Sequence, residues 1–340
     1  MSLLKPSDRR VMLREINEIP SRVERQLAVH GEAYRERGAW LNREPPRFVT
    51  TCARGSSDCA ALYLKYLVEM RLGIPVSSIG PSVASLYLSS LQTQGAVSFA
   101  VSQSGGSQDI AALHQSLQSG GARGIALINA DDSLLGKISQ HTLPIGAGSE
   151  VAVPATKSFV CSLVAIASIV AEWANDQHLA SALEGLPEAL AKTLSLNSDD
   201  RFGVLSNKNS AFVLSRGPSL AVAQEAALKL KETAFVHAEA FSAAEVLHGP
   251  AALVDSGFVC MIFPPQDQAR DEVLETAGQL KKMGAQIITM EVEETTAAIH
   301  PLLVPLLQII RFYVLAEEFA QKRGLNPDMS RNLRKITDTL

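Results

Sequence analysis

The stretch AVSQSGGSQDI, residues 100–110, joins an apolar run to a polar turn rich in glycine and serine. Residues 96–101 are largely apolar and predict a strand, whereas Ile110, Leu113 and Leu117 recur at helical spacing. A turn of this composition between a strand and a helix exposes backbone N–H groups at the helix N-terminus, where anions bind. This order of elements is typical of the α/β class of proteins.

The side chains of this turn allow two interpretations. Ser102, Ser104 and Ser107 add hydroxyl donors and Gln103 adds an amide, which makes the turn a candidate anion site. The alternative is an ordinary turn with Ser107 as the helix N-cap, because glycine and serine are common in turns without a ligand. The residues of the turn alone leave both interpretations open.

The same order of strands and helices occurs twice along the chain. FVTTCARGSS in the first half resembles SAFVLSRGPS in the second, and Arg54 corresponds to Arg216. The offset between the copies is about 160 residues throughout. We therefore predict an α/β protein of two tandem units, each a parallel sheet flanked by helices in a three-layer α/β/α arrangement.

The two copies differ at the turn quoted above. The second copy has Pro264, Pro265 and Gln266 where the first has Ser102, Gln103 and Ser104. Proline has no backbone N–H to offer an anion. The anion site is therefore expected in the first copy only.

This repeat divides the chain into five predicted segments. They are an N-terminal helical segment (1–44), a first unit (45–174), a connecting segment (175–204), a second unit (205–320) and a C-terminal tail (321–340).

Composition limits the partners of the chain. Its 340 residues are 46% hydrophobic and 19% charged, as in a globular protein. The formal net charge of −4, without a stripe of Lys or Arg, argues against a nucleic-acid partner. The longest apolar stretch, residues 159–171, is too short to span a bilayer, so we expect no membrane partner.

The cysteines and the N-terminus suggest a compartment. Cys52, Cys59, Cys161 and Cys260 form no C-x-x-C pair and lie in apolar surroundings. No signal peptide is recognisable. We expect a cytoplasmic protein with reduced cysteines.

The second copy carries the richest polar segment, residues 221–253. On a helix, Glu225, Lys229 and Glu232 share one face. The alternative is that they merely stabilise a solvated helix, by about 0.2–0.5 kcal/mol for each pair. His248 follows in a loop, where a lone histidine is commonly a surface residue.

Several motifs together resemble one known family. SRGPSLAVAQEAALKLKETAFVHAEAFSAAEVLHGP, SQSGGSQD and GSEVAVPATKSF are similar, in order and spacing, to the isomerase domain of glucosamine-6-phosphate synthases. That domain is a pair of sugar-isomerase (SIS) units. The resemblance extends from MLREINEIP to SRNLRKIT, nearly the whole chain.

The resemblance implies a substrate-binding set. In the family, the phosphate of a hexose 6-phosphate or amino sugar 6-phosphate rests on loops of the first unit. The matching residues here are Ser57, Ser102, Gln103, Ser104 and Ser107. The family usually has an acidic residue and a threonine where this chain has Gly106 and Ser107. Loss of the carboxylate removes a negative charge, and the serine keeps the hydroxyl.

The resemblance also implies a catalytic set. Glu232 matches the base that moves a proton between C1 and C2, and His248 matches the residue that opens the sugar ring from a neighbouring subunit. Lys335 matches the Schiff-base lysine, although by itself it reads as a solvated tail residue. Glu225 and Lys229 match polar residues that flank the reacting carbons. The resemblance implies a homodimer with shared active sites. It implies no metal or organic cofactor.

The function expected from these matches is that of a glucosamine-6-phosphate deaminase. Only some forty residues precede the first unit and the first cysteine is Cys52, so no glutaminase domain is expected on this chain and glutamine-dependent synthesis is excluded. The expected reaction converts glucosamine 6-phosphate and water to fructose 6-phosphate and ammonia. A deglycase of fructosamine 6-phosphate, an ammonia-dependent aminotransferase and a non-catalytic phosphosugar-binding regulator remain alternatives. The residues do not distinguish gluco from galacto substrates.

Overall fold

Two structural units make up the chain in the computed structural model, which describes residues 10–130, 132–197, 199–292 and 299–335. The first unit contains residues 21–149 and 157–184, and the second contains residues 10–20, 150–156 and 185–335. Residues 1–9 of the predicted N-terminal segment and residues 336–340 of the predicted tail lie outside the described residues.

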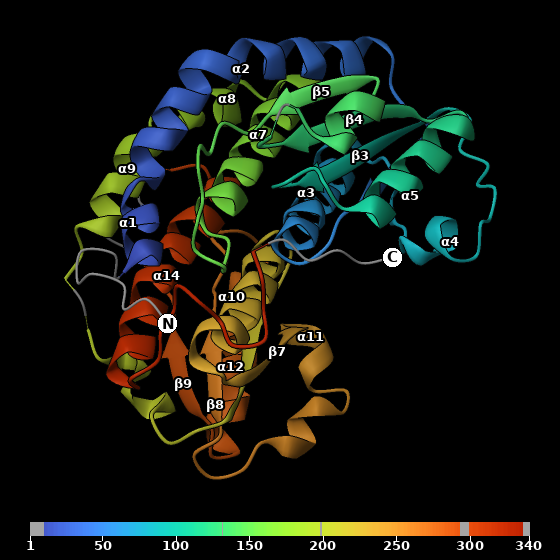
Figure 1. The fold of residues 1–340 in the computed structure, drawn as a ribbon. Helices are drawn as coiled ribbons and strands as arrows, with labels where there is room; N and C mark the ends of the chain where they lie inside the picture. Colours follow the sequence, from blue (N-terminus) through green and yellow to red (C-terminus); the bar gives the residue numbers. More distant parts are fainter. Residues whose placement is uncertain (1–9, 131, 198, 293–298, 336–340) are drawn as a thin grey trace. The chain divides into compact units, whose positions relative to one another are not determined.

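The first unit is built on a five-stranded parallel sheet with the order β2-β1-β3-β4-β5. Its strands β3, β4 and β5 are labelled in Figure 1. Its strands are β1 (Phe48–Cys52), β2 (Val76–Ser78), β3 (Ala96–Ser102), β4 (Arg123–Ile128) and β5 (His141–Pro144). Every residue of the central strand β3 is buried. A strand buried on both faces needs helices on both sides, and the sequence supplies them.

Helices cover both faces of this sheet. They are most of α2 (Ile19–Arg43), together with α3 (Ser56–Leu72), α4 (Ser82–Ser85), α5 (Gln108–Ser119), α6 (Leu134–Ile138), α7 (Lys157–Trp173) and α8 (Gln177–Glu184). Helix α5 packs against α4 and α6, and α3 packs against α7. Ala96 and Ala100 of β3 belong to the core under α5, so Val97 and Phe99 face the opposite side.

The second unit repeats this arrangement. Its four-stranded parallel sheet has the order β7-β6-β8-β9, which matches β2-β1-β3-β4 strand for strand. The strands are β6 (Ser210–Ser215), β7 (His237–Ser242), β8 (Val259–Ile262) and β9 (Gln286–Thr289). The prediction of two tandem units with parallel sheets is confirmed.

The helices of the second unit again lie on both sides of its sheet. They are α1 (Val11–Asn17), α9 (Leu186–Leu194), α10 (Ser219–Ala234), α11 (Ala243–Val246), α12 (Arg270–Lys282) and α14 (Val304–Lys322), with short 3₁₀ turns η2 (Arg201–Leu205), η3 (Pro250–Leu253) and η4 (Pro301–Leu303). Helix α10 packs against β6, β7 and α14, which leaves it enclosed on several sides. This enclosure determines the environment of its charged residues.

Some predicted elements differ in detail. The apolar run of residues 302–318 predicts a final helix, and in the structure α14 spans Val304–Lys322 after the 3₁₀ turn η4. The edge strands β2 and β7 were not predicted, because neither has the apolar run that marks a buried strand. The five predicted segment boundaries remain a prediction.

Two further expectations concern partners and cysteines. All four cysteines are buried and carry free thiols, as predicted. Within the part of the chain that the structure describes, no helix is both long and apolar enough to cross a lipid bilayer.

Candidate functional site

The turn after β3 folds back on itself through its serines. Ser102 Oγ accepts a hydrogen bond from the Gly105 amide at 3.0 Å, and Ser104 Oγ accepts one from the Gly106 amide at 3.3 Å. Ser102 is buried, whereas Gln103, Ser104 and Ser107 are half-buried. The hydroxyls therefore shape the turn, and those of Ser104 and Ser107 remain partly accessible.

Glycine is required at position 105. Its φ of +61° lies in the left-handed region, and a Cβ placed there would lie 2.2 Å from Ser133 Oγ. The Gly105 carbonyl also accepts the amide of Leu135 at 3.0 Å. The turn is therefore held tightly against the start of α6.

The N-terminus of α5 is open to a ligand. Ser107 occupies the N-cap position, but its side chain makes no capping hydrogen bond. The amides of Ser107 and Gln108 have no hydrogen-bond partner among the described residues. Such amides, at the positive end of a helix dipole, are suited to an anion.

Ser57 lies at the same edge of the first sheet. It is half-buried in the first turn of α3, directly after β1, and β1 pairs in parallel with β3. The carboxyl ends of neighbouring parallel strands meet at one edge, so the α3 turn neighbours the α5 turn. Arg54, before Ser57, donates to the buried Asp109 carboxylate in the first turn of α5 through Nε (2.7 Å) and Nη2.

The corresponding turn of the second unit is already occupied by its own chain. Asp267 Oδ1 accepts the Ala269 amide at 2.9 Å, and the Asp267 carbonyl accepts the Arg270 amide at 3.1 Å. The Pro264 carbonyl accepts Gln308 Nε2 at 2.8 Å. The start of α12 therefore has an internal anion where the start of α5 has open amides.

Helix α10 carries a row of buried charges. Glu225 and Lys229 are completely buried, with Lys229 Nζ 3.5 Å from Glu225 Oε1, and Lys229 Nζ also contacts Glu232 Oε2. Tyr313 of α14 donates to Glu225 Oε1 at 2.8 Å. The interpretation of these residues as a solvated surface pair is therefore wrong. Burying charged side chains costs desolvation free energy, and such buried charges are typical of functional sites.

Only Glu232 of this row reaches open space. Its side chain is 17% exposed, and it lines a pocket of about 500 Å³ at the end of α10. The pocket is bounded by Leu228, Lys231, Glu232, Phe235, Val236, His237, Ser330, Arg331, Asn332 and Leu333. The Arg331 guanidinium lies 4.2 Å from the centre of the Phe235 ring. The tail therefore forms one wall of the pocket into which the Glu232 carboxylate opens.

Lys335 does not line this pocket. Its ammonium pairs with the buried carboxylate of Glu150, with Nζ and Oε2 3.0 Å apart. Glu150 Oε1 accepts the Thr156 amide at 2.9 Å. The tail is thus folded onto the chain as far as Lys335.

His248 stands apart from the other predicted catalytic residues. It is exposed in the loop after α11, and its backbone amide donates to the Glu245 carbonyl at 2.9 Å. No contact with Glu225, Lys229 or Glu232 is found among the described residues.

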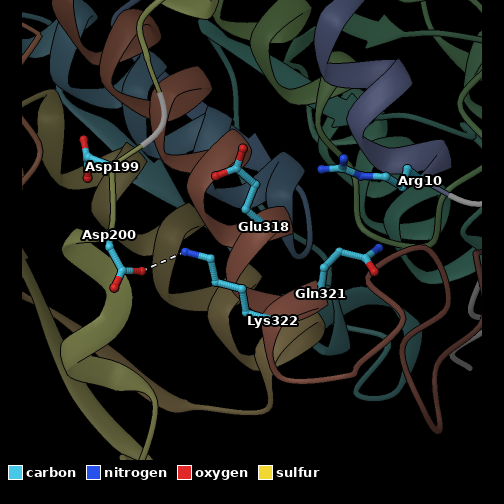
Figure 2. A pocket seen from close by; sticks show the side chains of 6 residues that line it. All are labelled: Arg10, Asp199, Asp200, Glu318, Gln321 and Lys322. Atoms are coloured by element: carbon cyan, nitrogen blue, oxygen red, sulfur yellow. Dashed lines mark hydrogen bonds and ion pairs between the residues drawn. The ribbon is translucent and has the colours of Figure 1, made fainter.

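Another hollow of the second unit is lined by charged residues with partners of their own (Figure 2). Lys322 Nζ lies 2.7 Å from Asp200 Oδ1, as the dashed line in Figure 2 shows. Arg10 Nη2 lies 2.5 Å from Glu317 Oε2. Hydrogen bonds from Arg201 hold the pKa of Asp199 at about 2. These pairs stabilise structure, and none of the predicted site residues lines this hollow.

A Cys–Ser–His group in the first unit resembles a catalytic arrangement. His114 Nδ1 lies 3.2 Å from Ser98 Oγ and 3.9 Å from Cys52 Sγ. Burial raises the pKa of the Cys52 thiol to about 12 and lowers the pKa of His114 to about 4. A neutral thiol with no access to solvent is not a nucleophile, so this group is part of the core.

The structure brings the predicted site residues together in two separate groups, one in each unit. Within the second unit it joins Glu225, Lys229 and Glu232, and within the first unit it joins the loop serines. Tyr313 and Glu150 were not among the predicted site residues. Glu150 lies in the motif GSEVAVPATKSF, which was its only signal. In the described part of the chain, no group of three His, Cys, Asp or Glu side chains is arranged to hold a metal ion.

Known proteins resemble this chain over most of its length. A glutamine–fructose-6-phosphate aminotransferase (isomerizing) of Symbiobacterium thermophilum is 32% identical over 315 residues, which are 85% of this chain and 51% of the relative. The chain thus spans about half the length of the curated relatives it matches.

Two solved structures share the fold. One from Silicibacter pomeroyi, provisionally assigned as a phosphosugar isomerase, is 43% identical with a TM-score of 0.88, over 94% of this chain and 99% of that one. A glucosamine-6-phosphate deaminase from Thermotoga maritima is 21% identical with a TM-score of 0.77, over 97% of this chain and 100% of that one. This second similarity concerns the fold alone.

A family model for the SIS domain matches residues 47–171 and 204–298. The first matched segment contains strands β1 to β5 and the second contains strands β6 to β9. The chain therefore belongs to the SIS family and consists of two tandem SIS domains.

Proposed function

We propose that the chain is an aldose–ketose isomerase of amino sugar phosphates that releases ammonia. Its reaction converts glucosamine 6-phosphate and water to fructose 6-phosphate and ammonia. The observation that carries this proposal is the buried row Glu225–Lys229–Glu232, of which only Glu232 opens into a pocket. The printed names of the relatives, which include fructose 6-phosphate and isomerizing activity, support the substrate class.

Glu232 is the proposed base. In the open-chain aldose, removal of the C2 proton gives an enolamine, and return of a proton to C1 gives the C2 imine of the ketose. One carboxylate beside both carbons can take and return that proton. Lys229, buried against Glu232, holds the carboxylate in one orientation, and Glu225, which accepts a hydrogen bond from Tyr313, holds Lys229.

His248 and Lys335 have the remaining proposed roles. His248 opens the pyranose ring, and its exposure in the described chain suits a residue that serves the site of a neighbouring subunit. Lys335 adds through its neutral amine to the C2 imine and releases ammonia. Water then hydrolyses the lysine imine to the ketone and restores the amine.

The turn between β3 and α5 is the proposed phosphate site. The open amides of Ser107 and Gln108, the hydroxyls of Ser104 and Ser107 and the nearby Ser57 offer donors to a phosphate. Ser102 and Gln103 support the shape of the turn and its rim.

Release of ammonia from a panel of amino sugar phosphates tests the proposal. We expect ammonia and fructose 6-phosphate from glucosamine 6-phosphate, without added metal or organic cofactor. Ammonia from fructosamine 6-phosphate alone would instead identify a deglycase. Binding of the sugar phosphates without turnover would identify a regulator, and formation of glucosamine 6-phosphate only from added ammonia would identify an aminotransferase.

We further propose a cytoplasmic homodimer with shared active sites. Four buried thiols without a disulfide are typical of a reducing compartment. A His248 supplied by the other subunit requires a dimer, so a fully active monomer in light scattering at assay concentration would exclude shared sites.

A further inference from the structure

Glu150 is a buried carboxylate that the proposed mechanism does not use. Its side chain is completely buried, and both of its oxygens are hydrogen-bonded, Oε1 to the Thr156 amide and Oε2 to Lys335 Nζ. Burial of a carboxylate is costly unless cations or hydrogen bonds compensate its charge. The desolvation cost of burying Glu150 beside Lys335 suggests that this carboxylate has a function.

The tail depends on this carboxylate for the position of Lys335. Glu150 is the partner that the structure gives to the Lys335 ammonium, whose side chain is 23% exposed. Residues 331–334, just before it, are exposed. The neighbouring contacts are at Asp328, whose carbonyl accepts the Val153 amide at 3.0 Å, and at Arg331, whose guanidinium lies 4.2 Å from the centre of the Phe235 ring. Beyond these, the last contact of the tail among the described residues is the Glu150–Lys335 pair.

The segment that carries Glu150 is itself fixed. Glu15 Oε1 accepts the Val151 amide at 2.6 Å, and Glu15 Oε2 accepts the Ala152 amide at 3.3 Å. Asp328 in turn accepts the amides of Val11 and Met12 at the start of α1, at 3.0 and 2.7 Å. Glu150 is thus presented from a rigid anchor, and the flexible lysine side chain docks on it.

We propose that Glu150 is the positioning residue that seats Lys335, and with it the wall of the Glu232 pocket formed by residues 330–333. This proposal rests on the proposed function only for the role of Lys335 as an amine that adds to the sugar. The seating of the tail by Glu150 is independent of it. Glu150 acts through Lys335 and does not itself touch the sugar.

The test compares Glu150→Gln with Glu15→Gln. Both changes remove a buried carboxylate that accepts amides of residues 151–156 and keep its size, but only Glu150 pairs with Lys335. In Glu150→Gln we expect amide exchange of residues 328–335 to rise about tenfold, as loss of about 1.4 kcal/mol of local stability would cause. In Glu15→Gln that exchange should stay within about twofold of the wild type, because the glutamine oxygen can still accept the Val151 amide and Lys335 keeps its partner Glu150.

A chemical readout reports on Lys335 itself. Borohydride in the presence of fructose 6-phosphate traps a lysine imine, and peptide mass mapping locates it. Trapping at Lys335 should fall about tenfold in Glu150→Gln, parallel to the loss of seating, while equilibrium binding of the sugar phosphate changes less than about twofold. Glu150→Asp should restore part of the trapping, because it restores the charge.

The outcomes separate the two proposals. Wild-type exchange and wild-type trapping in Glu150→Gln, or equal effects in Glu15→Gln, would overturn the positioning role. Absence of an adduct in the wild type would count against the proposed function and leave the exchange measurement to decide the seating. If Glu150→Gln does not fold, Lys335→Gln breaks the same pair from its exposed side and should raise tail exchange equally.

Discussion

The turns after β3 and β8 occupy the same place in two copies of one fold, yet only the first is open to a ligand. At the start of α5 the Asp109 carboxylate accepts the Ile110 amide, but the amides of Ser107 and Gln108 lack partners in the described chain. At the start of α12 the Asp267 carboxylate accepts the Ala269 amide, and the Asp267 carbonyl accepts the Arg270 amide. Both helices have the same dipole. The comparison indicates that a helix N-terminus is a candidate anion site where the amides at its cap are left without acceptors from the chain itself.

The two copies nevertheless keep a common frame. Arg54 pairs with Asp109 in the first turn of α5, and Arg216 pairs with Glu272 in the first turn of α12. In each copy an Arg-Gly step with a glycine at positive φ precedes the helix after the first strand. The two copies therefore differ in the residues of the turn itself, but both keep the Arg–carboxylate pair and the glycine that hold the turn.

A second contrast concerns helices α3 and α10, which correspond in the two copies. Each has a Glu–Lys pair at the i, i+4 spacing, Lys65–Glu69 in α3 and Glu225–Lys229 in α10. The side chains of the α3 pair are 35% and 34% exposed, and those of the α10 pair are completely buried. Identical spacing thus gives a surface pair in one copy and the buried support of Glu232 in the other.

The largest expected effect separates α10 from α3 in catalysis. Glu232→Gln removes the proposed base and should lower kcat by about 10²- to 10⁴-fold, while binding of the sugar phosphate persists. Glu69→Gln on α3 is the matched control and should leave kcat unchanged. The measurement is solvent deuterium exchange at C2 of glucosamine 6-phosphate and C1 of fructose 6-phosphate. Exchange at the wild-type rate in Glu232→Gln would assign the base to another group.

The next largest effect is a difference in stability between variants of the same two helices. Lys229→Met leaves buried carboxylates without their cation and should lower the free energy of unfolding by about 3–5 kcal/mol. Lys65→Met, which breaks the partly exposed pair, should cost less than about 1 kcal/mol. Urea unfolding of the two variants measures the difference. Equal losses would show that burial of the α10 pair has no energetic weight.

Titration of a core histidine should distinguish the two units as pH falls. Burial lowers the pKa of His114 in α5 to about 4, whereas α12 contains no histidine. In the unfolded chain the same histidine binds a proton near pH 6.5, whereas the folded chain keeps His114 neutral down to about pH 4. Folding is therefore not opposed by His114 above pH 6.5, and the free energy of unfolding falls as pH drops from 6.5 toward 4. The loss should reach about 3 kcal/mol in urea unfolding between these limits. His114→Leu should remove that part of the pH dependence, and an unchanged slope would contradict the assignment.

The smallest effect tests the two turns directly. Ser104→Asp places a carboxylate beside the proposed phosphate site and should raise KM at least tenfold, equivalent to about 1.4 kcal/mol. Gln266→Asp makes a similar change in the turn of the second unit and should leave KM unchanged. The KM of both variants follows from initial rates of ammonia release. A KM unaffected by Ser104→Asp would make the β3–α5 turn purely structural.

Much of the fold follows from local patterns. The apolar strands and the repeated Arg-Gly steps predict two parallel α/β units, because a strand buried on both faces must be apolar throughout. The edge strand β7 escapes prediction because its residues HAEAFS have no apolar run and are mostly partly exposed. Its place is set by pairing with β6, which the sequence of β7 does not reveal.

The candidate site is predictable only where its residues are close in sequence. Helical spacing placed Glu225, Lys229 and Glu232 on one face, but their burial depends on the packing of α10 against α14. The Glu150–Lys335 pair joins positions 185 residues apart, and no periodicity reports such a contact. The serine at position 107 predicted a cap, yet its side chain makes no capping bond.

The division of the chain between its units has a consequence for cooperativity. The chain passes from one unit to the other between residues 20 and 21, 149 and 150, 156 and 157, and 184 and 185. Residues 150–156 therefore belong to the second unit while both of their covalent neighbours belong to the first. An excised half would lack part of its own interior, so the duplicated units no longer qualify as autonomous modules. A second unit expressed from residue 185 onward should therefore unfold at lower urea concentration than the same unit in the whole chain, despite the internal repeat.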